Sequence, residues 1–228
     1  MNKQLNILCA ALVAGFLSAG ANADMLVDWD LSGMTGTEAS RASFSAAAGI
    51  TGLDLARGAG LAGNTGANSL NTKGWDGANG DDYISFGFSV AQGLEVDLDS
   101  LVIGSKSSST GPGTIGLFHN GDNFTTALTT FVQDGANYVN AIVDLSNLAS
   151  LTGTVEFRLY EVGDTQADGV GATSSAGTFR VAEYTDGANF TNLQINGAVA
   201  APVPEPETYA LMLAGLGLVG ALARRRKG

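Results

Sequence analysis

From about Met25 to Val199, hydrophobic and polar residues alternate with a period of two along most of the chain. Side chains of a strand point to alternate faces, so this pattern predicts about ten β-strands that each bury one face. We therefore expect residues 24–199 to form an all-β domain, an antiparallel two-sheet sandwich that is jelly-roll-like. The predicted strands are Met25–Leu31, Ser43–Leu55, Tyr83–Val90, Leu94–Ser105, Thr114–Asn120, Thr125–Val132, Tyr138–Leu145, Thr154–Val162, Gly177–Tyr184 and Phe190–Gly197.

The tetrapeptide Asp-Gly-Ala-Asn recurs between these segments, at Asp76–Asn79, Asp134–Asn137 and Asp186–Asn189. Asp-Gly favours the type I′ turn of a β-hairpin, because both central residues of that turn need positive φ. The last two copies each separate two strand-like segments, so they predict hairpins. Outside the strands we expect at most one helical turn, near Asn147–Leu151.

Residues 1–23 have the order of a secretory signal peptide, with basic Lys3, an apolar run and a small-residue ending. This order predicts a signal helix that is removed between Ala23 and Asp24. A retained membrane anchor is the alternative, which the short apolar run disfavours. The single cysteine, Cys9, lies in this segment, so we expect the exported chain to have neither a thiol nor a disulfide.

Between Asp24 and Ala200 the chain has 20 acidic and 6 basic residues, a net charge of −14. Such a surface disfavours nucleic acids and anionic membrane surfaces as partners. It is compatible with simple solubility outside the cytoplasm or with the binding of divalent cations.

Three alternating carboxylates, Glu95, Asp97 and Asp99, are the main candidates for catalysis. Their spacing puts them on one face of a strand and resembles the Glu-x-Asp-x-Glu strand of family 16 jelly-roll glycanases. In that family the first Glu is the nucleophile and the last is the acid/base, with carboxyl groups about 5–5.5 Å apart. Asp99 is shorter than the expected Glu, and the other interpretation is the polar face of a strand that buries Val96 and Leu98. We therefore expect no enzymatic activity.

The single histidine, His119, has no cysteine or nucleophile-elbow motif to act with, and we expect a surface or strand-end residue. The long loop Gly58–Asp82 contains Trp75, either an exposed platform for a glycan or a lid over the core. The same loop has oxygen ligands that Ca²⁺ would accept, although without EF-hand spacing. The candidate calcium ligands are Asp76, Asn79, Asp81 and Asp82.

A linker and a three-part segment follow the domain over residues 200–228. Pro204, Glu205 and Pro206 precede an apolar run at 209–223, about 22 Å long as a helix and thus a minimal transmembrane span. The basic residues after the run would stay on the cytoplasmic side of the membrane and leave the acidic domain outside. They are Arg224, Arg225, Arg226 and Lys227.

This ending resembles the PEP-CTERM sorting signal of exopolysaccharide-producing Gram-negative bacteria. The resemblance implies recognition by an inner-membrane exosortase, transient membrane insertion, cleavage near the Pro-Glu-Pro motif and transfer to the outer surface or matrix. We expect an exported protein of the cell envelope or extracellular matrix with a structural or adhesive role among exopolysaccharide. The alternatives are a carbohydrate-binding module, with or without calcium, and a jelly-roll glycanase.

Overall fold

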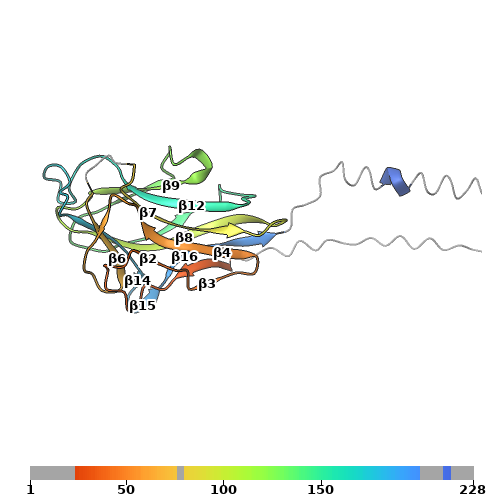
Figure 1. Cartoon of the computed structure of the whole chain (residues 1–228), viewed down its shortest axis with the longest axis horizontal. Helices are drawn as coiled ribbons and strands as arrows, with labels where there is room; N and C mark the ends of the chain where they lie inside the picture. Colours follow the sequence, from red (N-terminus) through yellow and green to blue (C-terminus); the bar gives the residue numbers. More distant parts are fainter. Residues whose placement is uncertain (1–23, 76–79, 201–212, 217–228) are drawn as a thin grey trace, which may run out of the picture.

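Two antiparallel β-sheets form the body of the protein, which the computed structural model describes over residues 24–75, 80–200 and 213–216 (Figure 1). Every strand pair is antiparallel, which confirms the prediction of an all-β antiparallel sandwich. Sheet A has the order β3 (Ser45–Ala46), β1 (Asp24–Trp29), β16 (Leu193–Ala200), β8 (Glu95–Ser107), β13 (Thr178–Ala182), β6 (Ser69–Lys73) and β5 (Ala62–Gly63), with β11 (Val139–Asp144) also on β8. Sheet B has the order β10 (Thr129–Val132), β9 (Thr114–His119), β12 (Thr154–Glu161), β7 (Tyr83–Val90), β4 (Ile50–Arg57) and β2 (Ser40–Arg41).

The two sheets share one hydrophobic core, to which each strand contributes alternate side chains. In β7, Ile84, Phe86 and Phe88 are buried, whereas Tyr83 and Ser85 point outward. Trp29 of sheet A meets Phe86 of sheet B edge to face, with ring centroids 5.6 Å apart. The Trp29 indole also donates a hydrogen bond of 2.9 Å to the carbonyl of Leu53 in β4. One aromatic contact and one hydrogen bond of Trp29 therefore join the two layers.

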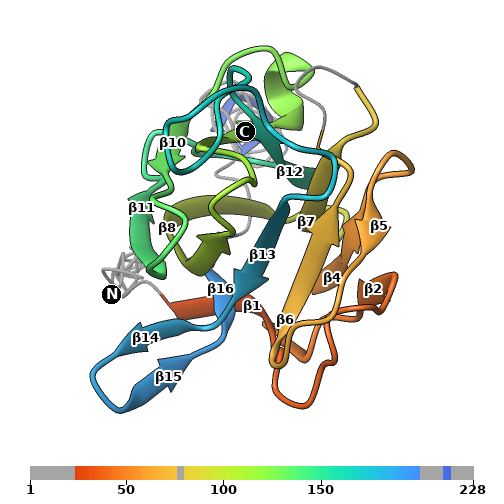
Figure 2. The ribbon, with the colours of Figure 1, turned by 90° about the vertical axis from the view of Figure 1, so that its left-hand side faces the viewer.

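The long strand β8 changes partner along one of its edges. Residues 95–102 of β8 pair with β16, and residues 104–107 pair with β13 on the same edge, while β11 occupies the other edge. The chain leaves the sheet between β13 and β16 and forms a separate hairpin from β14 (Tyr184–Asp186) and β15 (Asn189–Thr191). Figure 2 shows this hairpin projecting from the body of the sandwich.

The two described Asp-Gly-Ala-Asn segments behave differently. Asp186 pairs with Asn189 in a true hairpin, but only Gly187 of its two central residues has positive φ (60°), as a type II′ turn requires. The type I′ prediction is therefore wrong there. The hairpin prediction at Asp134–Asn137 is also wrong, because β10 and β11 belong to different sheets. The Asp134 carboxylate instead accepts backbone hydrogen bonds from residues 136 and 137, both 2.8 Å long, and so fixes a turn between the sheets.

Two local features of the structure, a short helix and a strand, were not predicted from the sequence. Residues 147–151 contain no helical turn, and the short 3₁₀ helix η1 lies at Asn120–Asp122 instead. Strand β6 was not expected, because its buried side chains include polar Ser69, Asn71 and Thr72 and the alternating pattern is lost. Each of the three side chains donates a hydrogen bond to a backbone carbonyl, which offsets the cost of burying it.

The predicted signal helix and most of the predicted membrane span lie outside the described residues. Residues 213–216 are helical, with Leu213 and Leu216 exposed. In the part of the chain that the structure describes, no helix has the length and apolarity needed to cross a bilayer.

Candidate functional site

Three aromatic side chains form a row on the outer face of sheet B, away from the core. They are Tyr83 of β7, Tyr160 of β12 and Phe118 of β9, and we call them the aromatic row. The Tyr83 and Tyr160 ring centroids are 5.5 Å apart, and Phe118 and Tyr160 meet edge to face at 5.4 Å. Tyr160 is directly opposite Tyr83 in the register, so strand pairing fixes the row in place. All three residues are partly exposed.

Arg158 stands beside the row with its guanidinium between two rings. Its guanidinium carbon lies 4.1 Å from the centroid of Tyr83 and 4.0 Å from that of Phe124, so both contacts are cation–π interactions. Its Nε donates to Glu156 Oε1 at 2.7 Å, and Nη1 donates to the Tyr160 hydroxyl at 3.0 Å. Partial burial alone would lower the pKa of Arg158, but the hydrogen bonds with Tyr160 and Glu156 raise it. The row is therefore joined to a fixed pair of opposite charges.

The loop after η1 holds Phe124 over Arg158. Asn120 fastens this loop to β12, because its side-chain amide donates to the Thr154 carbonyl at 2.8 Å and accepts from the Glu156 amide at 3.1 Å. Asn123 and Phe124 both have positive φ, 57° and 58°. A bulky aromatic residue is uncommon in this left-handed region, and such strain persists only where surrounding contacts impose it. Its presence beside the aromatic row indicates a site that is held in one arrangement.

His119 ends β9 on the core side, so the predicted strand-end position is correct and the surface alternative is wrong. Only 8% of the residue is exposed, and its ring centroid lies 5.3 Å from that of Phe157. His119 Nδ1 accepts a hydrogen bond of 3.2 Å from the Gly121 amide and so caps η1. Burial lowers the pKa of His119, which favours the neutral ring that this hydrogen bond needs.

Trp75 is a core residue, which corrects its assignment as an exposed glycan platform. Its exposed fraction is 0%, and its ring meets Phe179 edge to face at 5.7 Å. The indole Nε1 donates to Thr72 Oγ1 at 3.0 Å. No part of the ring is accessible to a sugar, so Trp75 covers the core at this end of the sandwich.

Glu95, Asp97 and Asp99 lie on the same face of β8, and Val96 and Leu98 between them are buried. This arrangement is the polar face of an amphipathic strand. Asp97 accepts a hydrogen bond from the Ser150 amide at 2.7 Å, and Asp99 accepts one from the Ser100 hydroxyl at 3.0 Å. The pockets described below have other residues in their walls.

The predicted calcium loop is described only in part. Asp81 is exposed and Asp82 is buried, whereas Asp76 and Asn79 lie outside the described residues. Within residues 24–75, 80–200 and 213–216, no group of three His, Cys, Asp or Glu side chains is placed to hold a metal ion. Calcium at this loop stays a prediction.

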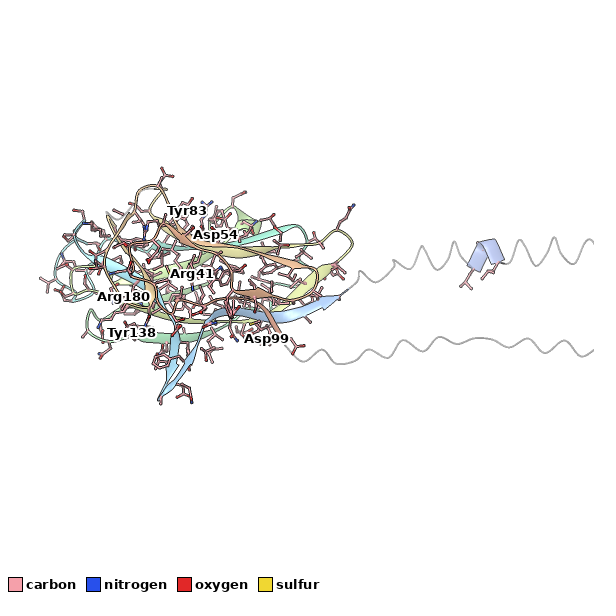
Figure 3. The ribbon with its side chains drawn as sticks, turned by 60° about the horizontal axis from the view of Figure 1, so that its bottom comes forward. Arg41, Asp54, Tyr83, Asp99, Tyr138 and Arg180 are labelled. Carbon is pink, nitrogen blue, oxygen red and sulfur yellow. The ribbon has the colours of Figure 1, made fainter. Side chains whose placement is uncertain are left out.

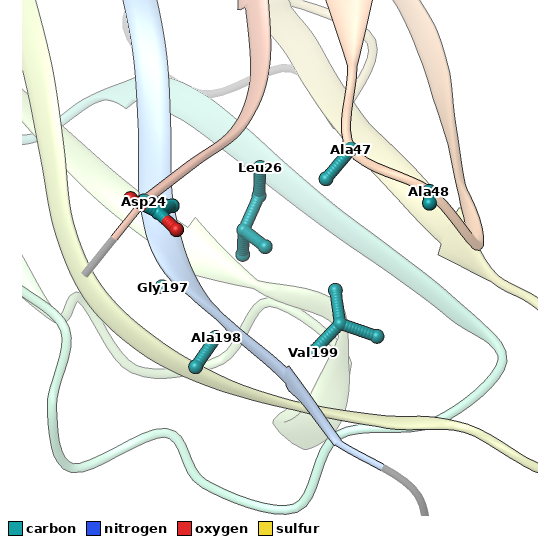
Figure 4. A pocket seen from close by; sticks show the side chains of 7 residues that line it. All are labelled: Asp24, Leu26, Ala47, Ala48, Gly197, Ala198 and Val199. Carbon is teal, nitrogen blue, oxygen red and sulfur yellow. The ribbon is translucent and has the colours of Figure 1, made fainter. Parts of the chain in front are cut away.

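A pocket of about 340 Å³ opens where β1 begins and β16 ends (Figure 4). Its walls are formed mainly by small and aliphatic side chains, among them Leu26, Ala47 and Val199, with Asp24 as the charged residue. A ligand site usually combines an apolar wall with several convergent polar groups. Asp24 is the one charged side chain in the wall of this pocket, whereas Arg158 and Glu156 both lie beside the aromatic row.

Comparison with known proteins gives the function of the C-terminal segment. Residues 202–227 match the family model of the PEP-CTERM protein-sorting motif. The chain carries a PEP-CTERM sorting motif. The match contains the predicted residues Pro204, Glu205 and Pro206 and the Arg224–Arg226 cluster, all of which lie outside the described residues. The motif implies export, sorting through the membrane and processing by an exosortase.

The body is similar to solved carbohydrate-binding modules at low identity. A family 29 module in complex with mannohexaose is 13% identical, with 78% of this chain and 93% of that chain covered and a TM-score of 0.38. Another family 29 module is 12% identical, with coverage of 78% and 90% and a TM-score of 0.40. A substituted family 29 module is 12% identical, with coverage of 80% and 100% and a TM-score of 0.39. No curated protein matches the sequence.

Sequence reasoning did not find the aromatic row, although a signal was present. Tyr83, Phe118 and Tyr160 occupy positions of their strands that point away from the core, where polar residues are expected. In an alternating strand, an aromatic residue at a position where the pattern expects a polar one indicates a ring on the outer face of the sheet. Three such residues indicate three outward rings, and the order of β7, β12 and β9 in sheet B brings them together in the row.

Proposed function

We propose that this protein is an exported matrix protein without catalytic activity, whose sandwich adheres to uncharged polysaccharide through the aromatic row. The observation that carries the proposal is the placement of Tyr83, Tyr160 and Phe118 side by side, and partly exposed, on the outer face of sheet B. The sorting motif supports export, and the proposed destination is the outer surface or extracellular matrix.

The chemistry of the row suits a sugar chain. Aromatic rings offer apolar surface to the C–H faces of pyranose rings, and their hydroxyl groups form hydrogen bonds. Arg158 and Glu156 lie beside the row and provide donors and acceptors that are already held in position. The body has a net charge of −14 between residues 24 and 200, which repels anionic polysaccharides over a distance. The ligand class is therefore an uncharged glycan.

The jelly-roll description belongs to this proposal as well. Strands β1, β16, β8 and β11 are consecutive neighbours in sheet A, and β7, β12, β9 and β10 are consecutive neighbours in sheet B. Eight strands divided between two sheets in this way support a jelly roll with additional edge strands.

Binding to a panel of soluble neutral polysaccharides, measured by affinity electrophoresis, tests the proposal. Tyr160→Ala removes the central ring and should weaken binding about tenfold, equivalent to about 1.4 kcal/mol. Tyr160→Phe keeps the ring and loses only the hydrogen bond to Arg158, so it should bind nearly as well as wild type. Phe44→Ala is the matched control, because Phe44 is 67% exposed and lies outside the row.

Three outcomes would contradict parts of the proposal. Equal binding by Tyr160→Ala and wild type would place the ligand elsewhere, and binding lost on chelation would favour the calcium-assisted alternative. Release of reducing ends that Glu95→Gln abolishes would identify a glycanase. For the destination, deletion of residues 204–228 should move the protein from the surface or matrix fraction to another cell fraction, as seen by immunoblot.

A further inference from the structure

The β14–β15 hairpin contributes nothing to the core yet is fixed to the body. No residue of Tyr184–Thr191 is buried, and Phe190 is 68% exposed. Asn140 of β11 holds the hairpin through both atoms of its side-chain amide, which donates to the Thr185 carbonyl at 2.9 Å and accepts from the Thr185 amide at 3.1 Å. A projecting element that is fastened in this way and exposes an aromatic ring is suited to contact with a partner molecule.

A pocket of about 170 Å³ lies at the base of this hairpin. Two rings line it, Phe190 from β15 and Tyr138 just before β11, and Tyr138 is 47% exposed. Asn68, Glu183 and Thr185 also form part of its wall. The Lys106 ammonium lies 5.3 Å from the centroid of the Tyr138 ring and donates to the Ala136 carbonyl at 2.5 Å, so it steadies that ring from outside the pocket.

The pocket faces the opposite side of the sandwich from the aromatic row. Val139, Ala141 and Val143 of β11 pack against the core, so the alternate positions Tyr138 and Asn140 point outward from sheet A. Tyr83 points outward from sheet B. Figure 3 shows Tyr83 and Tyr138 at opposite sides of the body. A molecule bound at one site therefore does not obstruct the other.

We propose that the pocket between Tyr138 and Phe190 is a second sugar-binding site, which takes one uncharged sugar residue. Its two rings supply apolar contact, and the carboxylate of Glu183, the hydroxyl of Thr185 and the amide of Asn68 in its wall can bond sugar hydroxyls. The small volume limits the site to one residue or a chain end, and the Glu183 carboxylate disfavours an acidic sugar. With the aromatic row, on whose proposed function this step rests, the site makes the protein a cross-linker of polysaccharide chains.

Bridging between beads coated with neutral galactomannan or mixed-linkage β-glucan tests the cross-link. The full chain is used in a polyoxyethylene detergent, which contains no sugar. Wild type should aggregate the beads of at least one type. Phe190→Ala and Tyr160→Ala should each abolish aggregation while the protein still binds the beads, more weakly, through the site that remains. The double variant should lose binding, and Phe44→Ala should behave as wild type.

The outcomes separate this inference from the proposed function. Aggregation that survives both Phe190→Ala and Tyr138→Ala would overturn the second site and leave the aromatic row intact. Absence of binding by wild type to either polysaccharide would overturn both. Sedimentation of the protein without sugar is the third measurement. If wild type is a dimer and Phe190→Ala is a monomer, the hairpin is a protein interface and the sugar site is overturned. Tyr138 and Phe190 are exposed, so circular dichroism should show both variants folded as wild type.

Discussion

Replacement of Trp75 by alanine should destabilise the sandwich strongly and leave sugar binding unchanged in the folded protein. The indole is fully buried, meets Phe179 edge to face and donates a hydrogen bond to Thr72. Burial of about 200 Å² of an aromatic side chain stabilises the folded state by about 5 kcal/mol. Part of this is retained by the alanine methyl group and by relaxation around the cavity, so the expected loss is about 3–5 kcal/mol.

Urea unfolding followed by far-UV circular dichroism measures this loss directly, because the free energy of unfolding falls linearly with urea. Trp75→Phe should lose only about 1–2 kcal/mol, since it keeps the contact with Phe179 and loses the hydrogen bond and part of the buried area. A loss below about 1 kcal/mol for Trp75→Ala would refute the burial argument. If polysaccharide binding fell at the same time, Trp75 would be a surface platform after all.

Two further substitutions test the titration of His119 and the close approach at Gly104. Burial lowers the folded-state pKa of His119 below 6.5, so the unfolded state binds the extra proton and stability should fall as pH decreases from about 6.5. His119→Asn keeps an acceptor for the Gly121 amide and should remove this fall, which thermal unfolding between pH 5 and 7.5 measures; an unchanged slope would exclude His119 as its source. A Cβ atom at Gly104 would lie 2.2 Å from the Glu183 carbonyl oxygen, so Gly104→Ala should cost about 1–3 kcal/mol in urea unfolding. Gly80→Ala, whose Cβ would meet nothing within 4 Å, is the control, and equal stability of the two variants would contradict the packing at the hairpin base.

Hydrophobic alternation predicts the strands whose two faces differ. Tyr83–Val90 is recovered with its bounds, and Thr154–Val162 differs from β12 by one residue, because each strand has core residues on one face and partly exposed residues on the other. The pattern fails at β6, where four successive residues are buried and their polar side chains bond backbone carbonyls. It also fails at Phe190–Gly197, where the end of the hairpin and the start of β16 form one continuous alternating run in the sequence.

The candidate sites depend on the register of paired strands and on the order of strands in each sheet. Hydrophobic alternation along the chain predicts neither. Tyr160 lies beside both Tyr83 and Phe118 because β12 pairs with β7 and β9, although 77 residues separate Tyr83 from Tyr160 in the chain. Tyr138 and Phe190 likewise line one pocket although they are far apart in the chain, and Asn140 fastens the hairpin to β11 beside it. By contrast, the sorting motif is a contiguous pattern, and its match at 202–227 could be found from the residues alone.

The pairing of β1 with β16 has a mechanical consequence for a protein sorted through its C-terminal segment. β1 begins beside the end of β16, with Asp24 opposite Gly197, so both strands lead to the same end of the sandwich. Tension between attachments at these two neighbouring ends would open the ladder one hydrogen bond at a time. Tension between residues after Ala200 and a bound polysaccharide would instead pull β16 along its own axis. β16 lies between β1 and β8, so that force loads many hydrogen bonds at once and the sandwich resists it in shear.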